Sequence, residues 1–350
     1  MNESPARPRA HVEGLRLRHF EGDDDYVTIA GLIAVANLAD GIDDIPTAES
    51  LRAEYEPRTD IDPRRDLVLA QLDGRLVGHG EVFRQVRDGV AMYWTFGAVL
   101  PEDRRRGIGG TILRANEARI REIAAGHEDV GGRAFASWVS VREGGANELL
   151  TNAGYEARRY GFAMVRATLD DLPLASLPDG LEVRSVEPGH HRPIFEADNE
   201  AFRDHWGHRE ATDDDFAARH ANPDLDTSLW RVAWDGDEVA GGVLPWVYAS
   251  ENEAFGVRRG WLERIFVRRQ WRKRGLATAL IVTALEELRS RGDDGGDARR
   301  RCREPDRRAP PLRGPGIHGK GPIHPLPEGV LSAPIRSPLR CWWRCPRRSS

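Results

Sequence analysis

Cysteine, long apolar runs and a leader-like N-terminus are scarce or missing in this sequence of 350 residues. The three cysteines, Cys302, Cys341 and Cys345, all lie within the last fifty residues, so the body of the chain has neither a disulfide framework nor a cysteine nucleophile. No apolar run is long enough to cross a bilayer, and the first ten residues lack the apolar segment of a signal peptide. We therefore expect a cytoplasmic protein without a membrane partner.

The charge of the chain is unevenly distributed. The net charge is −5, but residues 293–350 carry +7 and residues 1–292 carry −12. A basic tail is typical of proteins that bind nucleic acid, yet this tail has ten prolines and seven glycines, neither a helical nor a strand period, and no nucleic-acid-binding motif. We predict that residues 293–350 are disordered and outside the fold, as are residues 1–13, and that the protein binds no nucleic acid.

What the chain does contain is a hexapeptide that occurs twice. Residues 104–109 (Arg-Arg-Arg-Gly-Ile-Gly) and residues 272–277 (Arg-Lys-Arg-Gly-Leu-Ala) are 168 residues apart. Each copy follows an apolar run typical of a strand and opens an apolar run typical of a helix, where free N–H groups and the helix dipole favour an anion. Glycine lets the backbone approach phosphate oxygens closely. The repeat predicts two pyrophosphate sites.

The repeated hexapeptide divides the chain into two units. We expect the first unit at residues 14–167 and the second at residues 181–292, joined by a linker at residues 168–180 with two prolines and a terminal glycine. Each unit has the order strand, two helices, hairpin with an Asp-Gly turn, strand, hexapeptide and helix. The fold class is therefore α/β (mixed α+β), with two tandem domains that each contain a mixed, mostly antiparallel sheet flanked by helices.

The elements expected in the first unit are strands at residues 15–20, 67–72, 76–84, 91–100, 134–141 and 157–167 and helices at residues 24–38, 47–55, 107–125 and 147–152. Those expected in the second unit are strands at residues 181–186 and 261–267, a hairpin at residues 229–248 and helices at residues 192–205, 212–220 and 275–291. After Gly292 the second unit provides no counterpart of the first unit's closing strand, short helix and final strand. It is therefore incomplete at its C-terminal end.

With the hexapeptide at a strand-to-helix junction, residues 14–166 and 181–291 resemble the GNAT superfamily of N-acetyltransferases, whose signature is Gln/Arg-x-x-Gly-x-Gly/Ala. The tandem layout resembles the mycothiol-synthase-like branch. The resemblance implies acetyl-CoA as co-substrate, no metal, and direct acetyl transfer in a ternary complex to the amine of a small molecule or a peptide N-terminus. It also implies that the fourth and fifth strands splay apart around pantetheine, and that a main-chain N–H of the fourth strand binds the thioester carbonyl.

The resemblance implies cofactor-binding residues in both units, with the strand ends assigned by the offset of 168 residues. They are Val99, Arg104, Arg105, Arg106, Gly107, Ile108, Gly109 and Gly110 in the first unit and Phe266, Val267, Arg272, Lys273, Arg274, Gly275, Leu276, Ala277 and Thr278 in the second.

Glu263 is the candidate base, because a carboxylate on the fourth strand usually removes the proton of the acceptor amine. It also alternates with apolar neighbours, so a solvated strand residue paired with Arg264 or Arg258 is the alternative interpretation. His205 is a weaker candidate base, since the pKa of histidine suits the role. His205 and His208 lack a third ligand at a recognisable spacing, which disfavours zinc.

The first unit lacks both expected proton-handling groups. Thr95 occupies the position of Glu263, and Leu150 stands four residues before Gly154-Tyr155, where the family usually has a tyrosine acid. We therefore assign catalysis to the second unit and a degenerate or binding role to the first. The alternatives are a non-catalytic acyl-CoA-binding or regulatory module, and an inactive product of a frameshifted gene.

A frameshift would explain the tail. Read one nucleotide forward from Asp293, the codons that can encode the tail permit a strand, an Asn-Pro that opens a short helix, and a tyrosine four residues before Gly-Phe. That tyrosine would occupy the acid position which Leu150 holds in the first unit. We therefore predict that residues from Asp293 onward are a shifted reading of the missing domain end.

Overall fold

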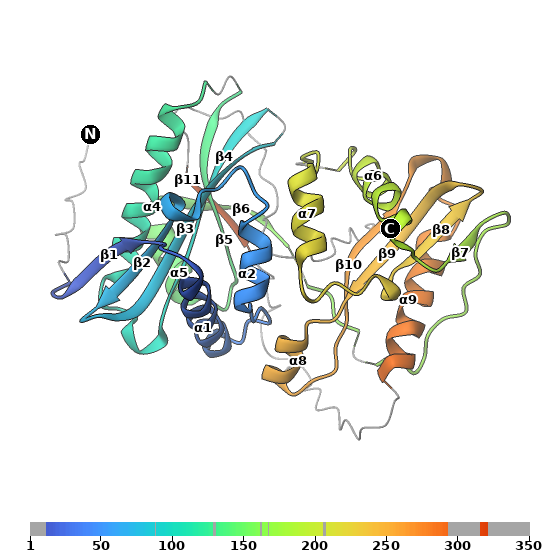
Figure 1. Cartoon of the computed structure of the whole chain (residues 1–350), viewed down its shortest axis with the longest axis horizontal. Coiled ribbons are helices and arrows are strands. Elements are labelled where there is room, and N and C mark those ends of the chain that lie inside the picture. Colours follow the sequence, from blue (N-terminus) through green and yellow to red (C-terminus); the bar gives the residue numbers. More distant parts are fainter. Residues whose placement is uncertain are drawn as a thin grey trace, which may run out of the picture.

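The computed structural model describes residues 12–292, apart from residues 88, 129, 130, 162, 167, 206 and 207, together with residues 316–320. Two sheets lie side by side, each covered by helices (Figure 1). Within this described part of the chain, no helix is both long and apolar enough to cross a membrane.

The first unit follows the predicted order of elements closely. In chain order it contains β1 (Leu15–His19), α1 (Asp23–Asp40), α2 (Ala48–Tyr55), α3 (Pro63–Asp66), β2 (Leu67–Leu72), β3 (Arg75–Arg87), β4 (Val90–Val99), η1 (Pro101–Asp103), α4 (Ile108–Ala125), β5 (Arg133–Val139), α5 (Gly144–Asn152) and β6 (Tyr155–Tyr160). The turn between β2 and β3 places Asp73 and Gly74 at positive φ, 50° and 83°, as the Asp-Gly pair predicts.

The first sheet has the strand order β1-β2-β3-β4-β5-β11-β6. Its neighbours are antiparallel except for β4 and β5, which run parallel. Successive side chains of a strand point to opposite faces; accordingly Trp94 packs with Ile29 and Ile33 of α1, whereas Tyr93 packs with Ile120 of α4. Helices α1 and α2 therefore cover one face of this sheet, and α4 and α5 cover the other.

The second unit repeats the opening of the first. It contains β7 (Glu182–Arg184), η2 (Pro188–His190), α6 (His191–Ala201), α7 (Asp213–Ala221), η3 (Thr227–Leu229), β8 (Arg231–Asp235), β9 (Glu238–Trp246), α8 (Ala249–Phe255), β10 (Trp261–Val267), η4 (Arg269–Trp271) and α9 (Leu276–Gly292). Its antiparallel sheet has the order β10-β9-β8-β7. Ile194 of α6 packs on one face and Leu280 of α9 on the other.

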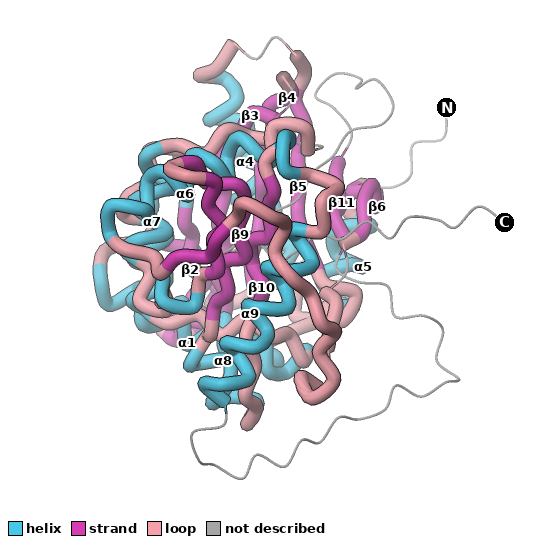
Figure 2. Tube along the Cα trace, turned by 90° about the vertical axis from the view of Figure 1, so that its right-hand side faces the viewer, coloured by secondary structure: helices cyan, strands magenta, loops and turns pink. Residues whose placement is uncertain are grey.

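Two expectations about the ends of the units were wrong. Residues 316–320 of the tail form β11 (Gly316–Lys320), which lies between β5 and β6 of the first sheet (Figure 2); the rest of residues 293–350 and residues 1–11 lie outside the described residues. The strand expected at residues 157–167 ends at Tyr160. Because β11 occupies the place beside β5 and β6, the residues after Tyr160 find no strand to pair with there. Helix α8 was not foreseen.

The two units are joined by polar contacts as well as by the linker. Helix α2 packs against α7, as Figure 1 shows. The carboxylate of Asp214 accepts hydrogen bonds from the main-chain N–H and the hydroxyl of Thr59, at 3.1 and 2.6 Å. The hydroxyl of Ser250 donates to the carbonyl of Ile45 at 2.7 Å. These contacts hold the second unit, including α8 and β10, against the first unit.

Candidate active site

The two hexapeptide loops share one backbone conformation. The second residue of each copy has a positive φ, 64° at Arg105 and 62° at Lys273, and so does the fourth, 90° at Gly107 and 85° at Gly275. Left-handed residues in such a turn can aim successive N–H groups toward one side and form a concave anion-binding nest. Helices α4 and α9 begin immediately afterwards, so their positive ends face the same place.

The leading arginine of each loop fixes the loop to its unit. Nε of Arg104 donates to the carbonyl of Val99 at 3.1 Å, and Nη1 contacts Asp40 at 2.8 Å. In the second unit, Nε of Arg272 donates to the carbonyl of Val267 at 2.9 Å. Each guanidinium thereby ties the end of the preceding strand to the loop that follows, which points to a positioning role for a residue that the motif alone assigned to phosphate.

The second and third positions of the loops differ between the units. Arg105 and Arg106 form ion pairs with Glu148 and Asp103, at 2.5 and 2.6 Å, whereas Arg274 donates to the carbonyl of Asp179 in the linker at 3.4 Å. The remaining predicted cofactor residues build the start of each helix or the core beneath it: Ile108, Leu276 and Phe266 are buried, and Gly109, Gly110, Ala277 and Thr278 lie in the first turn of α4 or α9.

A cavity of about 990 Å³ opens beside the first loop. Strands β4 and β5 pair only as far as Trp94 and Ala136; beyond them the hydroxyl of Ser137 donates to the carbonyl of Thr95 at 2.7 Å, and the strands then separate. The separated ends line the cavity together with Val99 and with the glycines at positions 107, 109 and 110. This is the splayed geometry that the resemblance implies, next to the pyrophosphate nest.

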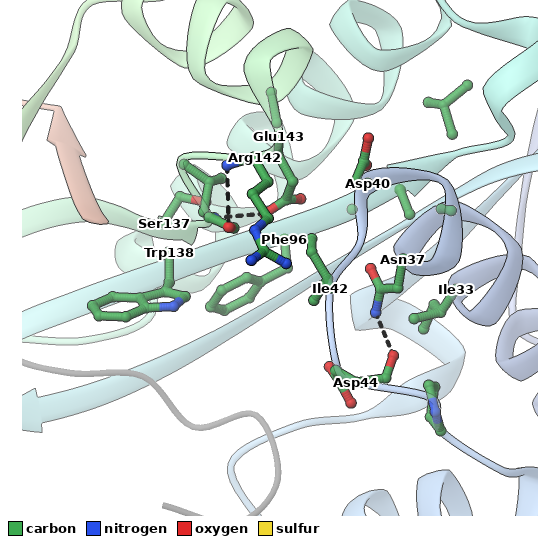
Figure 3. A pocket seen from close by; sticks show the side chains of 18 of the residues that line it. Ile33, Asn37, Asp40, Ile42, Asp44, Phe96, Ser137, Trp138, Arg142 and Glu143 are labelled. Carbon is green, nitrogen blue, oxygen red and sulfur yellow. Dashed lines mark hydrogen bonds between the residues drawn. The ribbon is translucent and has the colours of Figure 1, made fainter. Parts of the chain in front are cut away.

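The segment after α1 borders the cavity, and residues of the second unit form one of its walls. Figure 3 shows Asn37 of α1 donating to the carbonyl of Asp44, at 2.6 Å, which fixes the segment after α1 along the rim. Residues Asn222, Asp224, Tyr248, Glu251, Trp261 and Glu263 of the second unit line the opposite side. The described residues of the second hexapeptide loop do not contribute to this lining. One chamber therefore connects the first unit's nest with the second unit's candidate base.

Glu263 owes its orientation to a β-bulge. The pairing of β10 with β9 shifts between Leu262 and Arg264, and a bulge of this kind re-aims the extra side chain. Glu263 is 3% exposed, lines the cavity, and accepts a hydrogen bond from the Tyr248 hydroxyl at 3.4 Å. It is therefore a buried acid facing a chamber.

The arginines that could have paired with Glu263 are held elsewhere. Nη2 of Arg264 lies 2.7 Å from the buried carboxylate of Asp198, and Arg258 donates to the carbonyl of Arg291 at 3.2 Å. Glu251, the other buried acid of this wall, accepts a hydrogen bond from Nε1 of Trp261 at 2.9 Å. The geometry thus favours a role in the chamber for Glu263 over a surface ion pair.

His205 is less well placed. It follows α6, is exposed, packs its ring against Phe202 with 5.5 Å between centroids, and does not contribute to the lining described for the cavity. Trp206 lies outside the described residues.

Thr95 and Leu150 of the first unit both line the cavity, but neither side chain is a proton-transfer group. The register of β4 with β3 is unbroken from Val90 to Val99, so Thr95 points toward α4, where its hydroxyl accepts a hydrogen bond from Asn116 at 3.0 Å. Leu150 is buried in the core beside Tyr155. Burial, reinforced by the carboxylate of Glu117, raises the pKa of Tyr155 far above its ordinary value, and its hydroxyl is therefore a fixed donor.

One polar pair in the first unit was not among the residues predicted from the sequence. The Tyr55 hydroxyl, at the end of α2, donates to the carboxylate of Glu81 on β3. The signal was available: Glu81 interrupts the apolar face of a strand that continues with Val82 and Phe83. Without the pairing of β3 with β4, however, nothing in the sequence relates it to the site.

The structure thus has a duplicated left-handed loop before a helix, with a splayed pair of strands beside the first copy. Residues 191–298 match the acetyltransferase (GNAT) family. Mycothiol acetyltransferase from Kineococcus radiotolerans is 30% identical over 275 residues, which cover 77% of this chain and 82% of that protein. Mycothiol acetyltransferase from Geodermatophilus obscurus is 29% identical over 228 residues, with 64% and 69% covered.

Solved structures agree on the fold. A GCN5-related N-acetyltransferase from Sphaerobacter thermophilus superposes with a TM-score of 0.60 at 24% identity, covering 90% of this chain and 97% of that one. A tandem GNAT protein from the clavulanic acid biosynthesis pathway gives 0.54 at 17% identity, with 87% and 98% covered. The chain belongs to the GNAT family of acetyltransferases, which transfer an acetyl group from acetyl-CoA to an amine.

Proposed function

We propose that this tandem GNAT protein acetylates the primary amine of a small, mycothiol-related molecule by direct transfer in a ternary complex. The names of the relatives support the acceptor class. The observation that carries the mechanism is Glu263, a buried carboxylate re-aimed by a bulge into a chamber shared by both units. Asp224, Glu251 and Glu263 make this wall acidic, which suits an acceptor that arrives as an ammonium ion.

In this proposal Glu263 removes a proton from the ammonium group, and the freed amine nitrogen attacks the thioester carbonyl carbon. The main-chain N–H at the end of β10, near Val267, stabilises the oxyanion. The carbon–sulfur bond then breaks, and the leaving sulfur takes the second proton that the nitrogen loses as it becomes an amide, while the first proton leaves Glu263 for the solvent. The nests of both loops hold pyrophosphate through main-chain N–H groups, which accounts for glycine at the fourth, left-handed position of each loop. We further propose that the protein acts in the cytoplasm.

The substitution Glu263→Gln tests the base. It keeps the size and the hydrogen bond with Tyr248 but removes the charge that accepts the proton. We expect kcat for acetyl-CoA-dependent acetylation to fall by roughly two orders of magnitude, with the KM for acetyl-CoA nearly unchanged, as measured by thiol release against a panel of small amines.

Glu253→Gln is the matched control, because Glu253 is an exposed residue of α8 outside the cavity lining. Equal kcat values and equal pH–rate profiles for wild type and Glu263→Gln would move the role to Glu251 or His205. Binding of acetyl-CoA without thiol release for any amine would instead support the non-catalytic module.

A further inference from the structure

The first unit contains a buried acid–tyrosine pair that the proposed mechanism does not use. Glu81 of β3 is 2% exposed and Tyr55 of α2 is 3% exposed, and the Tyr55 hydroxyl donates to Oε2 of Glu81. Burying a carboxylate is costly unless hydrogen bonds compensate. Buried ionisable groups with a specific partner, next to a cleft, are typical of functional sites.

The pair lies beside the separated end of β4. Glu81 stands directly opposite Phe96 in the pairing of β3 with β4, so both side chains point to the face that α1 and α2 cover. Phe96 and Tyr55 both line the cavity. Tyr55 therefore borders the same chamber as the separated end of β4, while Glu81 sits behind it.

The surroundings hold the pair rigidly. Nδ2 of Asn116 donates to the carbonyls of Glu81 and Phe96, at 3.3 and 2.9 Å, and so fixes the two strands beside the pair. The ring of Tyr55 stacks on that of Tyr26, with 6.2 Å between centroids. A proton-transfer group must be kept in place by its neighbours to act efficiently, and this arrangement meets that condition.

We propose that the first unit is a second acetyl-transfer site, in which Tyr55 is the catalytic residue and Glu81 its proton acceptor. Thr95 would make the first unit degenerate only if the base had to come from β4. In this proposal the base is Glu81 of the neighbouring strand β3. The ammonium group of an acceptor passes a proton to the Tyr55 oxygen while the hydroxyl proton of Tyr55 moves to Glu81. The amine nitrogen then bonds to the thioester carbonyl carbon, the carbon–sulfur bond breaks, and the nitrogen loses its second proton to the thiolate of CoA as it becomes an amide. The first proton leaves Glu81 for the solvent. This inference rests on the proposed acetyl transfer but not on Glu263.

The experiment uses the full chain in a Glu263→Gln background, with acetyl-CoA, a panel of small amines and thiol release as the readout. We expect residual turnover in this background. Adding Tyr55→Phe should lower that residual kcat about tenfold or more, leave the KM for acetyl-CoA unchanged and flatten the acidic limb of the pH–rate profile. Tyr26→Phe is the matched control, because it makes the same change in the adjacent buried ring, which is not in the cavity lining.

Glu81→Gln is the second variant and should flatten the same limb while keeping the shape of the pair. Melting curves and acetyl-CoA calorimetry identify any variant that fails to fold. The proposal is wrong if a folded, acetyl-CoA-binding Glu263→Gln protein has no turnover, or if Tyr55→Phe and Tyr26→Phe behave alike. An unaffected Glu263→Gln combined with an inactive Tyr55→Phe would overturn the role of Glu263 and support this one.

Discussion

The two units share the backbone of their hexapeptide loops and differ in the sheets that surround them. The left-handed residues and the leading arginine of the loop recur in both copies with nearly the same geometry. In the first unit β4 has a parallel neighbour and splays from it, whereas in the second, within the described residues, β10 is the edge of its sheet. A nest is a local backbone feature that six residues specify, but an acyl channel requires a second strand from far along the chain.

The units also differ in where a buried carboxylate lies relative to the shared chamber, since Glu263 lines it and Glu81 lies behind Tyr55. The bulge at Glu263 turns a residue of the fourth strand inward. The regular register of β4 leaves Thr95 on the α4 side of the sheet. Glu81 of β3 points to the opposite side, which α1 and α2 cover. Positions that correspond in the sequence repeat can therefore differ in side-chain direction, because one inserted residue changes which side chain reaches the site.

Restoring the reading frame of the tail should change the difference between the two units most. The family match ends at residue 298, shortly after the point where the second unit loses its counterpart of β5. Deleting one nucleotide near codon 293 should supply the missing strand, helix and tyrosine. We expect acetylation through Glu263 to rise by roughly 10²-fold or more, because a general acid alone contributes that much. Steady-state kinetics of the two chains checks this.

The same deletion sharpens the comparison in the first unit. It removes the sequence of β11, which leaves the place between β5 and β6 open. Met164 and Val165 are 72% and 79% exposed, so residues 161–166 gain apolar burial by pairing there. Amide exchange at residues 161–166 should slow in the restored chain. A genomic sequence without this alternative frame, or a protease-resistant and fully active chain as written, would overturn the frameshift.

Substituting the loop glycines should distinguish the contributions of the two nests to acetyl-CoA binding. Gly107→Glu and Gly275→Glu place a side chain and a negative charge at φ values of 90° and 85°. A left-handed side-chain residue costs about 1–3 kcal/mol, so affinity for acetyl-CoA at the altered site should fall about tenfold or more. In the chain as written we expect Gly107→Glu to lose more binding, because only the first loop lines the described cavity.

Isothermal calorimetry measures both stoichiometry and affinity. Gly236→Glu is the control, since Gly236 also has a positive φ, 58°, but lies in the hairpin turn between β8 and β9. Wild-type stoichiometry and affinity in both loop variants would show that neither nest binds the pyrophosphate.

The stability of the two units should depend on pH in different ranges, and this is the smallest of the expected effects. Burial lowers the pKa values of the adjacent His191 and His220, so the unfolded chain binds more protons as pH falls below about 6.5, and the second unit loses stability there. Burial alone would raise the pKa of Asp25, but the hydrogen bond from Arg18 contributes to a net lowering. Its contribution to the first unit therefore persists until below about pH 4.

Hydrogen exchange read by mass spectrometry at pH 7.5, 5.5 and 4 can follow each unit separately. His191→Gln should flatten the response of the second unit between pH 7.5 and 5.5 and leave the first unit unchanged. A simultaneous loss of protection in both units at one pH would contradict the separation.

Much of the fold was predictable because its signals are local. Alternating apolar residues define the strands around Asp73-Gly74 and Asp235-Gly236, and the hexapeptide defines the start of each long helix. The end of β6 was mispredicted because it depends on which strand occupies the neighbouring place. Glu263 could be proposed from its offset to the loop, whereas Tyr55 and Glu81 could not be related to the site, since they are 26 residues apart and meet only through the packing of α2 on β3.

The sequence by itself predicted the number of units, the position of both hexapeptide loops and an incomplete end of the second unit after Gly292, because each prediction depends on short-range chemistry or on a repeat. Only the tertiary structure decided that one chamber joins the first loop to Glu263, that a bulge turns this carboxylate inward, and that the first unit has an acid of its own. Those features arise from strand register and from the contact between the units, which no local pattern encodes.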